Sequence, residues 1–472
     1  MYSYDDRVVV FRSPRSLVLR RATAATRELI GALSAGVPAG ELGADRLGTV
    51  HQGLVKRLGP NLVHRFSCGG RELMRVEPAG RTGIDVSPRP LSGGDLRLSR
   101  FALMRAVDSG LLVESPRSGA RVIVTDADVW SLLFALDRTQ GADGGVPQCR
   151  GLDPEVVAGL LGVLLRLDLL DEQRPTAASE PRFTEDDDAS LRQWQFHDLL
   201  FHVHGRTSSP QELRFLDELP PQPAIKPETA GAVVELHRPR RADIHALDPR
   251  ITSVIESRRS VTSYGAEPLT AGQLGEFLYR TARVKSRYGA REGLYYDWDS
   301  RPPYERTRRP YPSAGASYEL ELYVTVLRCA GIAPGSYHYD PLRHCLRLVN
   351  DSEQDNARLL ASVSLPGTPD VVLTITSRIH RLTWNYASSA VTLTFQHVGA
   401  LHQTMYLVAT AMRLAPCALK GTEDPGAVTE ALALPALEEV VVGAFALGSP
   451  PDDPRPAATT SSRWQPVNDA DW

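Results

Sequence analysis

The sequence has few cysteines, no excess of positive charge and no leading apolar run, and each absence excludes a class of protein. Its 472 residues include five cysteines, an odd number without a C-x-x-C pair. A disulfide framework or zinc ribbon is therefore not expected, and a reducing cytoplasm fits best. A net charge of −3 gives no electrostatic reason to expect nucleic acid or an anionic membrane as a partner. Two acids precede the first apolar run, which argues against a signal peptide.

Residues 382–412 are a charge-free stretch long enough to raise the question of a membrane span. They contain no Asp, Glu, Lys or Arg, but amide and imidazole groups interrupt them, for example at Gln396, His397 and Gln403. Each such group would be costly to bury in hydrocarbon. We therefore expect part of a soluble core, where the stretch can line a ligand site, and no membrane span.

Length and composition divide the chain into about two to four domains. Pro220, Pro221, Pro223 and Pro227 crowd eight residues and favour an extended linker. The predicted organisation is a small α+β unit (1–95), a winged-helix-like peptide-binding region (96–215), a Pro-rich linker (216–230), a domain with the distinctive chemistry (231–450) and a C-terminal tail (451–472).

The winged-helix expectation rests on the pattern after residue 100. This predicts a helix that ends at residues 108–110, a strand at 120–126, and helices that start at Asp126 and Pro154. DNA recognition would need several basic side chains on one helix face, and residues 154–168 offer only Arg166. Peptide binding is therefore favoured, with DNA binding as the alternative. The spacing of His197, His202 and His204 suits packing better than a metal site, and we expect no metal.

A serine–arginine run and a turn of small residues carry the distinctive chemistry. Arg258, Arg259 and Ser260 suit a phosphate, although arginines at a helix end can also complement its dipole. The run PYPSAGA at 310–316 could let the backbone approach a planar cofactor, or be an ordinary tight turn. A long helix is predicted after residue 397, and it ends before Lys420, whose side chain could bind a phosphate.

Together these motifs resemble the nitroreductase fold, and more specifically the SagB/ThcOx-type azoline dehydrogenases. The resemblance rests on SRRS, on PSAGA followed by YELELY, on the hairpin GSYHYDP and on the helix beginning HVGALHQ, and it covers about residues 190–448. It implies an α+β, dimeric flavin domain with an antiparallel-rich sheet wrapped by helices, preceded by the winged-helix-like region. The implied activity is FMN-dependent oxidation of thiazoline or oxazoline rings to thiazole or oxazole in a ribosomally made peptide.

The resemblance also implies roles for particular residues. FMN phosphate and ribityl contacts would come from Arg258, Arg259 and Ser260, and the flavin ring would lie against Pro312, Ser313, Ala314 and Gly315. Gln403, Lys420 and Gly421 would complete the cofactor site. The implied partners are a precursor peptide that bears azoline rings, a cyclodehydratase and a second copy of the chain.

Two positions depart from the family pattern. Thr262 stands where another arginine is expected, and the W-K-Y motif appears as Trp384-Asn385-Tyr386. A neutral amide cannot exchange a proton at pH 7, so Asn385 could only orient substrate. Tyr386 is then the proton-transfer candidate, unless it is a core aromatic, with His397 as another possible base. The alternatives in function are a generic NAD(P)H-dependent FMN nitroreductase and a non-catalytic peptide-binding scaffold.

Overall fold

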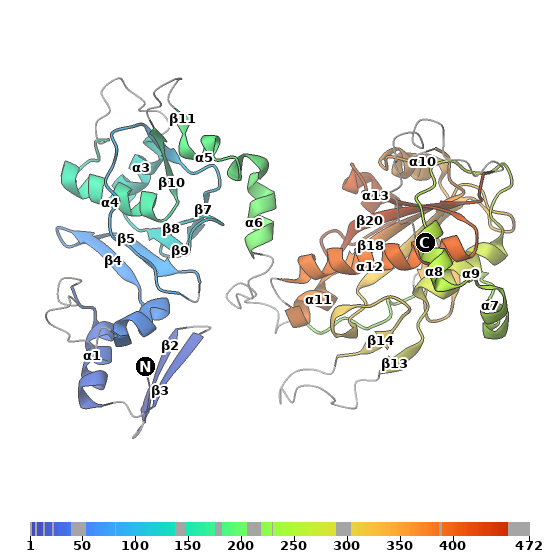
Figure 1. Cartoon of the computed structure of the whole chain (residues 1–472), viewed down its shortest axis with the longest axis horizontal. Coiled ribbons are helices and arrows are strands. Elements are labelled where there is room, and N and C mark those ends of the chain that lie inside the picture. The colour runs from blue at the N-terminus through green and yellow to red at the C-terminus, as the bar shows by residue number, and fades with distance from the viewer. Residues whose placement is uncertain are drawn as a thin grey trace, which may run out of the picture. The chain divides into compact units, whose positions relative to one another are not determined.

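The computed structural model describes residues 2–4, 7–12, 15–20, 23–38, 53–80, 82–136, 147–174, 182–204, 219–228, 230–288, 304–365, 367–386 and 389–451. The chain divides into two compact units, Met1–Glu212 and Leu213–Trp472, and each is described by itself (Figure 1). Both contain helices and antiparallel sheets, so the α+β class is confirmed. None of the described helices could cross a membrane. Apart from Pro451, the predicted tail lies outside the described residues.

The first unit is organised around a five-stranded antiparallel sheet of order β4-β5-β9-β8-β7. It joins strands on both sides of residue 95, where the sequence predicted a domain boundary. The helices α3 and α4 supply much of the core against this sheet, including Leu133 and Leu161. The strands and helices of this part are β4 (His64–Cys68), β5 (Arg71–Pro78), β7 (Leu103–Val107), β8 (Gly110–Glu114), β9 (Ala120–Val124), α3 (Ala127–Ala135) and α4 (Pro154–Arg166).

Smaller elements complete the first unit. They are β1 (Tyr2–Tyr4), β2 (Arg7–Arg12), β3 (Arg15–Arg20), α1 (Ala24–Ala35), η2 (Gly59–Asn61), β6 (Leu96–Leu98), β10 (Leu170–Arg174), β11 (Arg182–Phe183), α5 (Thr184–Asp187), η3 (Leu191–Gln193) and α6 (Phe196–His204). The strands β1, β2 and β3 form one sheet, and β11, β10 and β6 form another.

The prediction of a helix that ends at residues 108–110 is wrong. Strands β7 and β8 form a hairpin there, in which Val107 pairs with Gly110. Gly110 has φ +148, and a Cβ at this position would lie 2.2 Å from the carbonyl oxygen of Val124. The glycine thus lets the hairpin approach β9 closely, a long-range requirement that local periodicity does not reveal. The helices predicted from Asp126 and Pro154 are confirmed as α3 and α4.

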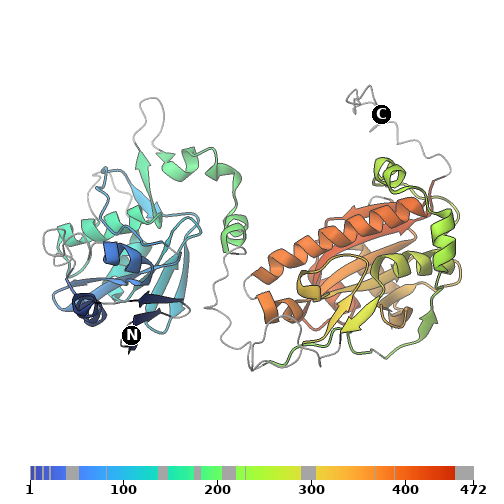
Figure 2. The ribbon, with the colours of Figure 1, turned by 60° about the horizontal axis from the view of Figure 1, so that its bottom comes forward.

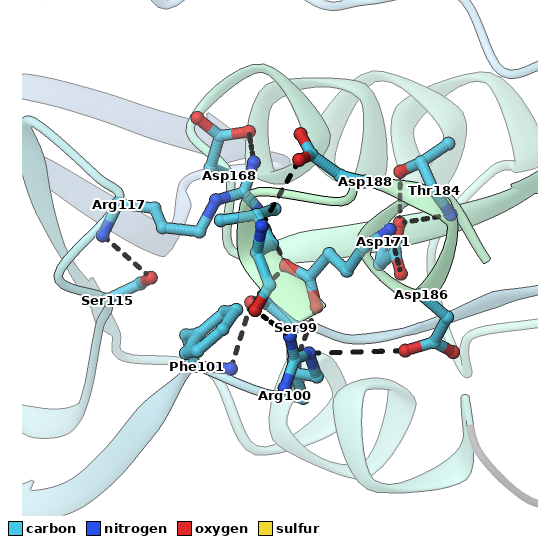
Figure 3. Close-up of polar contacts among 12 residues, drawn as sticks. Ser99, Arg100, Phe101, Ser115, Arg117, Asp168, Asp171, Thr184, Asp186 and Asp188 are labelled. Carbon is cyan, nitrogen blue, oxygen red and sulfur yellow. Dashed lines mark hydrogen bonds and ion pairs between the residues drawn. The ribbon is translucent and has the colours of Figure 1, made fainter. Parts of the chain in front are cut away.

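A buried ionic network fastens the segment 182–204 to the rest of the first unit (Figure 3). The carboxylate of Glu185, which is 1% exposed, accepts hydrogen bonds from the Ser99 hydroxyl at 2.6 Å and the Arg100 N–H at 3.0 Å. It also pairs with Arg117, whose other terminal nitrogen lies 3.0 Å from Asp168. The Arg100 guanidinium in turn donates to backbone carbonyls of Leu191 and Trp194. The network therefore holds α5 and η3, which precede α6.

The second unit is built on a seven-stranded sheet of order β12-β17-β16-β15-β18-β20-β19, with every pair antiparallel. Its strands are β12 (Val233–Glu235), β15 (Leu320–Val326), β16 (Gly335–Asp340), β17 (Cys345–Asn350), β18 (Val371–Arg378), β19 (Ala415–Leu419) and β20 (Glu439–Gly448). A separate ribbon pairs β13 (Ser286–Tyr288) with β14 (Arg306–Arg308). The hairpin predicted around Asp340-Pro341 is confirmed as β16 and β17.

Helices cover both faces of this sheet. The helices are α7 (Arg241–Leu247), α8 (Ile251–Ser257), α9 (Ala271–Ala282), α10 (Glu353–Ala361), α11 (Ile379–Tyr386), α12 (Ala390–Ala411) and α13 (Pro425–Ala431), with the short turn η6 (Ala314–Ala316). Side chains of α9 and α12 share the main core with alternate residues of β15, and Tyr323 from the same strand packs with α10 and α13 instead. In Figure 2 the long orange helix α12 runs along one face of the sheet.

Residues 219–228, which lie in the predicted Pro-rich linker, form neither helix nor strand and are bound to the second unit as a strap. Arg378 donates hydrogen bonds to the carbonyls of Pro223 and Ala224 at 2.9 and 3.2 Å. Lys226 pairs with buried Glu439 at 2.5 Å, and Arg381 donates to the carbonyl of Gln222. The strap thus contacts α11 and the residue before it, Arg378.

Replacement of Glu185 tests the ionic network. Glu185→Ala leaves Arg117 and Ser99 without their shared acceptor. We expect the free energy of unfolding of the first unit to fall by about 3 kcal/mol, the low end for a broken buried pair, because Arg117 is partly solvent-exposed. Urea unfolding of the full chain measures this, with Glu155→Ala on the exposed surface of α4 as the control, expected within about 0.5 kcal/mol of the unsubstituted chain. Equal effects of the two substitutions would contradict the assignment.

Candidate functional site

The serine–arginine run lies against α12 and β19. Arg258 follows the last residue of α8, and its guanidinium carbon lies 5.1 Å from the centroid of the Tyr406 ring. Ser260 Oγ lies 2.7 Å from the Tyr406 hydroxyl, which also accepts a hydrogen bond from the Ala418 N–H at 2.7 Å. Tyr406 therefore links the run to β19.

The exit of β19 lies next to this link. Lys420 and Gly421 directly follow the strand, Lys420 is exposed, and Gly421 has φ +126. Arg259 and Ser260 are exposed as well. The structure thus gathers the backbone of the residues predicted for a phosphate at one edge, with basic side chains accessible to an anion. Tyr406, which arranges them, was missed because nothing in its local sequence marks it.

The small-residue turn is accessible and forms η6. Pro312 and Gly315 are exposed, whereas Ser313 and Ala314 are half-buried. Gly315 has φ +57, a left-handed conformation that favours glycine. The Tyr318 N–H donates to Ser313 Oγ at 3.0 Å, so the turn is held by its own serine.

Tyr386 meets this turn. It is the last residue of α11, and a Cβ on Gly315 would lie 2.6 Å from the Tyr386 hydroxyl oxygen. The predicted proton-transfer group and the turn predicted to face the flavin are therefore neighbours, although 71 residues separate them in sequence (386 − 315). Asn385 is exposed on the same helix. Gln403 is exposed on α12, one turn before Tyr406.

His397 contacts the other side of the turn. Its Nε2 lies 2.8 Å from the Ala314 N–H nitrogen, and its Nδ1 lies 2.7 Å from a carboxylate oxygen of Glu319. Both ring nitrogens are therefore engaged, which does not suit the role of a base for substrate. Glu319 was missed because polar and apolar residues alternate in YELEL, a pattern that indicates a strand with its glutamates facing solvent. The structure instead buries Glu319 against His397, which is distant in sequence.

A fully buried arginine fixes α11 near the turn. The Arg381 guanidinium donates to the carbonyls of Ser317 at 2.8 Å and Glu305 at 2.9 Å, as well as to the strap. Its own carbonyl accepts the Tyr304 hydroxyl at 2.7 Å. Burial lowers the pKa of Arg381 to about 10, which leaves it charged at neutral pH. No group of His, Cys, Asp and Glu side chains with metal-binding geometry occurs in the described part of the chain.

Comparison with known proteins assigns the chain to a family. Residues 255–449 match the model of the nitroreductase family, and residues 96–210 match the model of the cyanobactin oxidase ThcOx. A protein described as a nitroreductase, from Methanocaldococcus jannaschii, is 30% identical over 186 residues, which are 39% of this chain and 82% of that protein. The chain belongs to the nitroreductase family, with a ThcOx-type region before the family domain. The two models support an oxidoreductase.

Two solved structures with similarity to this chain differ in how much of their own length the match covers. A nitroreductase from Anabaena variabilis is 18% identical with a TM-score of 0.35, and the match covers 48% of this chain and 40% of that one. The Escherichia coli microcin synthetase McbBCD, in complex with truncated pro-MccB17, is 18% identical with a TM-score of 0.33, over 46% of this chain and 84% of that one. The chain therefore spans less than half the length of the Anabaena protein.

A double-substitution cycle tests the contact between Gly315 and Tyr386. Gly315→Ala should lower the free energy of unfolding by more than the roughly 1–2 kcal/mol of left-handed strain, because the new methyl group also clashes with the hydroxyl. In a Tyr386→Phe background only the strain should remain, since the next ring atom would lie 3.6 Å away. Urea unfolding measures both steps.

The matched control is Gly399→Ala on α12, where a Cβ meets nothing within 4 Å and a modest stabilisation is expected. An equal cost of Gly315→Ala in both backgrounds would show that the hydroxyl does not lie over the turn.

Proposed function

We propose that this protein is an FMN-dependent dehydrogenase that oxidises thiazoline or oxazoline rings of a ribosomally made peptide to thiazole or oxazole. The observation that carries the proposal is the Tyr386 hydroxyl over Gly315, because it brings a group able to move a proton to the turn proposed to face the flavin. The ThcOx-type match of residues 96–210 supports a peptide substrate.

The residues present fit FMN at both ends of the cofactor. Arg258, Arg259 and Lys420 offer charge-assisted contacts to a phosphate, and Ser260 adds a hydroxyl that Tyr406 holds in place. The small residues from Pro312 to Gly315, of which the first and last are exposed, offer a surface that a flat ring can approach closely. Gln403 and Gly421 are proposed to complete the site.

In the proposed reaction the cofactor would accept the hydride and the chain would accept the proton. Aromatisation of an azoline removes a proton from the α-carbon and a hydride from the adjacent ring carbon. When bound, FMN would supply the acceptor for the hydride, with dioxygen as the final acceptor of the two electrons. The Tyr386 oxygen takes the proton, for which a phenol with an ordinary pKa of about 10 must first lose its own proton or act through a water. Asn385 can hold the substrate by hydrogen bonds but cannot titrate.

The family match favours a second candidate, an NAD(P)H-dependent FMN nitroreductase, because the M. jannaschii relative is described as a nitroreductase. Rapid bleaching of the flavin by NAD(P)H would support it. A non-catalytic peptide-binding scaffold is the third candidate, since Asn385 stands at the lysine position of the catalytic motif. A protein that stays colourless with added FMN would favour this scaffold over both enzymes.

The proposed partners are a precursor peptide, a cyclodehydratase that makes its azolines and a second copy of this chain. The second copy is supported by exposed apolar side chains on neighbouring helices, since α8 packs beside α12. These side chains, spaced by four residues along each stretch of chain, are Leu247, Ile251, Ile255, Val391 and Phe395. Exposed apolar side chains on neighbouring helices are a feature of many interfaces.

Replacement of Tyr386 tests the proton transfer. Tyr386→Phe removes one oxygen and almost no volume, so FMN content should be retained while the rate of azoline oxidation falls by about 10²–10⁴-fold, the usual effect of a positioned acid or base. Loss of two hydrogen atoms from a synthetic azoline peptide, followed by mass spectrometry, measures the rate. A fall below about tenfold with the flavin fully bound would remove Tyr386 from this role. Asn385→Lys is the companion variant, and a faster rate would show that the amide only weakens the motif.

Charge placed on the apolar face tests the dimer. Phe395, which is 51% exposed, should tolerate Asp in a monomer, but the charge would be desolvated in an interface. We expect Phe395→Asp to convert a dimer to a monomer in analytical ultracentrifugation. Phe134→Asp is the control, because Phe134 is also exposed, at 60%, but lies on α3 of the first unit. Identical dimer dissociation for the two variants would contradict an interface on α12.

A further inference from the structure

The contact between α12 and the small-residue turn is a buried pair of polar side chains. Glu319 is 0% exposed and His397 is 6% exposed. One carboxylate oxygen of Glu319 lies 2.7 Å from His397 Nδ1, and His397 Nε2 lies 2.8 Å from the Ala314 backbone nitrogen. A buried carboxylate is costly unless its hydrogen bonds are satisfied, so the contact requires an explanation.

The geometry determines which nitrogen of His397 carries the proton. A backbone N–H can only donate, so Nε2 must accept from Ala314 and carries no hydrogen. The proton is then on Nδ1 and is donated to Glu319. A proton on Nε2 would face the Ala314 N–H, donor to donor, and would break the contact with the turn.

The same contact decides which backbone donors the turn can offer to a ligand. The Ala314 N–H is used by His397, those of Ala316 and Ser317 bond within the turn, and that of Tyr318 bonds to Ser313 Oγ. Between residues 313 and 318, the N–H groups of Ser313 and Gly315 have no hydrogen-bond partner among the described residues. Glu319 also accepts from Ser313 Oγ at 3.5 Å, so the pair holds two successive residues of the turn.

We infer that His397 and Glu319 are positioning residues that set the turn, and with it the N–H groups of Ser313 and Gly315, for the flavin ring. This inference rests on the proposed function, since the ring is the ligand proposed for the turn. Glu319 fixes the tautomer of His397, and His397 fixes the Ala314 amide. Because exposed Gly315 directly follows Ala314, its backbone is positioned as well. Neither side chain transfers a proton to or from substrate, because both nitrogens of His397 are engaged.

A purely structural role would make the pair a staple between α12 and the segment before β15. Loss of such a staple would lower the melting temperature but would leave the environment of a bound flavin unchanged. The positions of the visible absorption bands of bound FMN report on that environment, and they therefore separate the two roles.

The experiment uses the full chain and compares His397→Leu with His397→Gln. FMN affinity is measured by fluorescence titration, and band positions by absorption at saturating FMN. Leu has no acceptor for the Ala314 N–H, so the affinity should fall by about tenfold or more and the bands should shift. The Gln amide oxygen can accept that N–H, so the affinity should stay within about threefold of the unsubstituted chain. Arg258→Ala is the control, expected to weaken FMN through its phosphate without moving the bands.

Glu319→Gln decides the matter if His397→Leu does not fold. A glutamine amide can donate to Nδ1 and shift the proton to Nε2, so this variant should also move the bands and weaken FMN binding. Unchanged affinity and bands in a folded His397→Leu or Glu319→Gln variant would overturn the inference and leave the proposed function intact. Failure of the unsubstituted chain to bind FMN would overturn the proposed function and the inference with it.

Discussion

The absence of a Cβ at residue 315 is the constraint on which the proposed chemistry depends. Any larger residue would bring its Cβ to 2.6 Å from the Tyr386 hydroxyl, so the Tyr386 side chain could not keep its position over the turn. Three segments distant in sequence meet at this point: the turn at 312–316, the end of α11 and the first half of α12. The hydroxyl that would take the proton and the surface that would face the cofactor are thereby held together before any ligand binds.

Buried charges hold these segments in place. Burial alone would raise the pKa of Glu321, but the Arg378 guanidinium and His338 hold it at about 2. A depressed pKa means that the pair adds stability above the ordinary range of a glutamate and loses it only as the pH falls toward 2. Burial lowers the pKa of Arg381 only to about 10, so it keeps its charge at neutral pH. The strap, α11 and the turn therefore stay connected through charged groups at any pH near neutrality.

Local signals in the sequence predicted many elements but not their contacts. Asp126 caps α3 as predicted, and the apolar spacing of α12 was evident from residue 398 onward. The hairpin at Leu103–Glu114 was missed because its glycine is required by the close approach of β9, which is distant in sequence, and not by the residues next to it. Glu319 bonds to His397, 78 residues away, and the partners of Arg381 include Gln222, 159 residues away, so no local pattern could have revealed these contacts.

The same distinction applies to the site. The resemblance carried in part by residues 258–260 and 312–315 implied a flavin site, and its motif at 384–386 implied a proton-transfer group. The structure brings Gly315 and Tyr386 together. The linking residues, Tyr406 and the His397–Glu319 pair, required the fold because each joins segments that the sequence keeps apart. The strap showed a further departure, since a proline-rich stretch that reads as a free linker is bound by Arg378 and Arg381.

The most direct test of the central claim is anaerobic mixing of the FMN-loaded protein with an azoline-bearing peptide, without NADH or NADPH, followed by absorbance of the bound flavin. If this chain oxidises azolines, the peptide alone bleaches the flavin, the product has lost two hydrogen atoms, and air restores the colour. A flavin that the peptide leaves oxidised but that NAD(P)H bleaches would contradict the account and favour a nitroreductase.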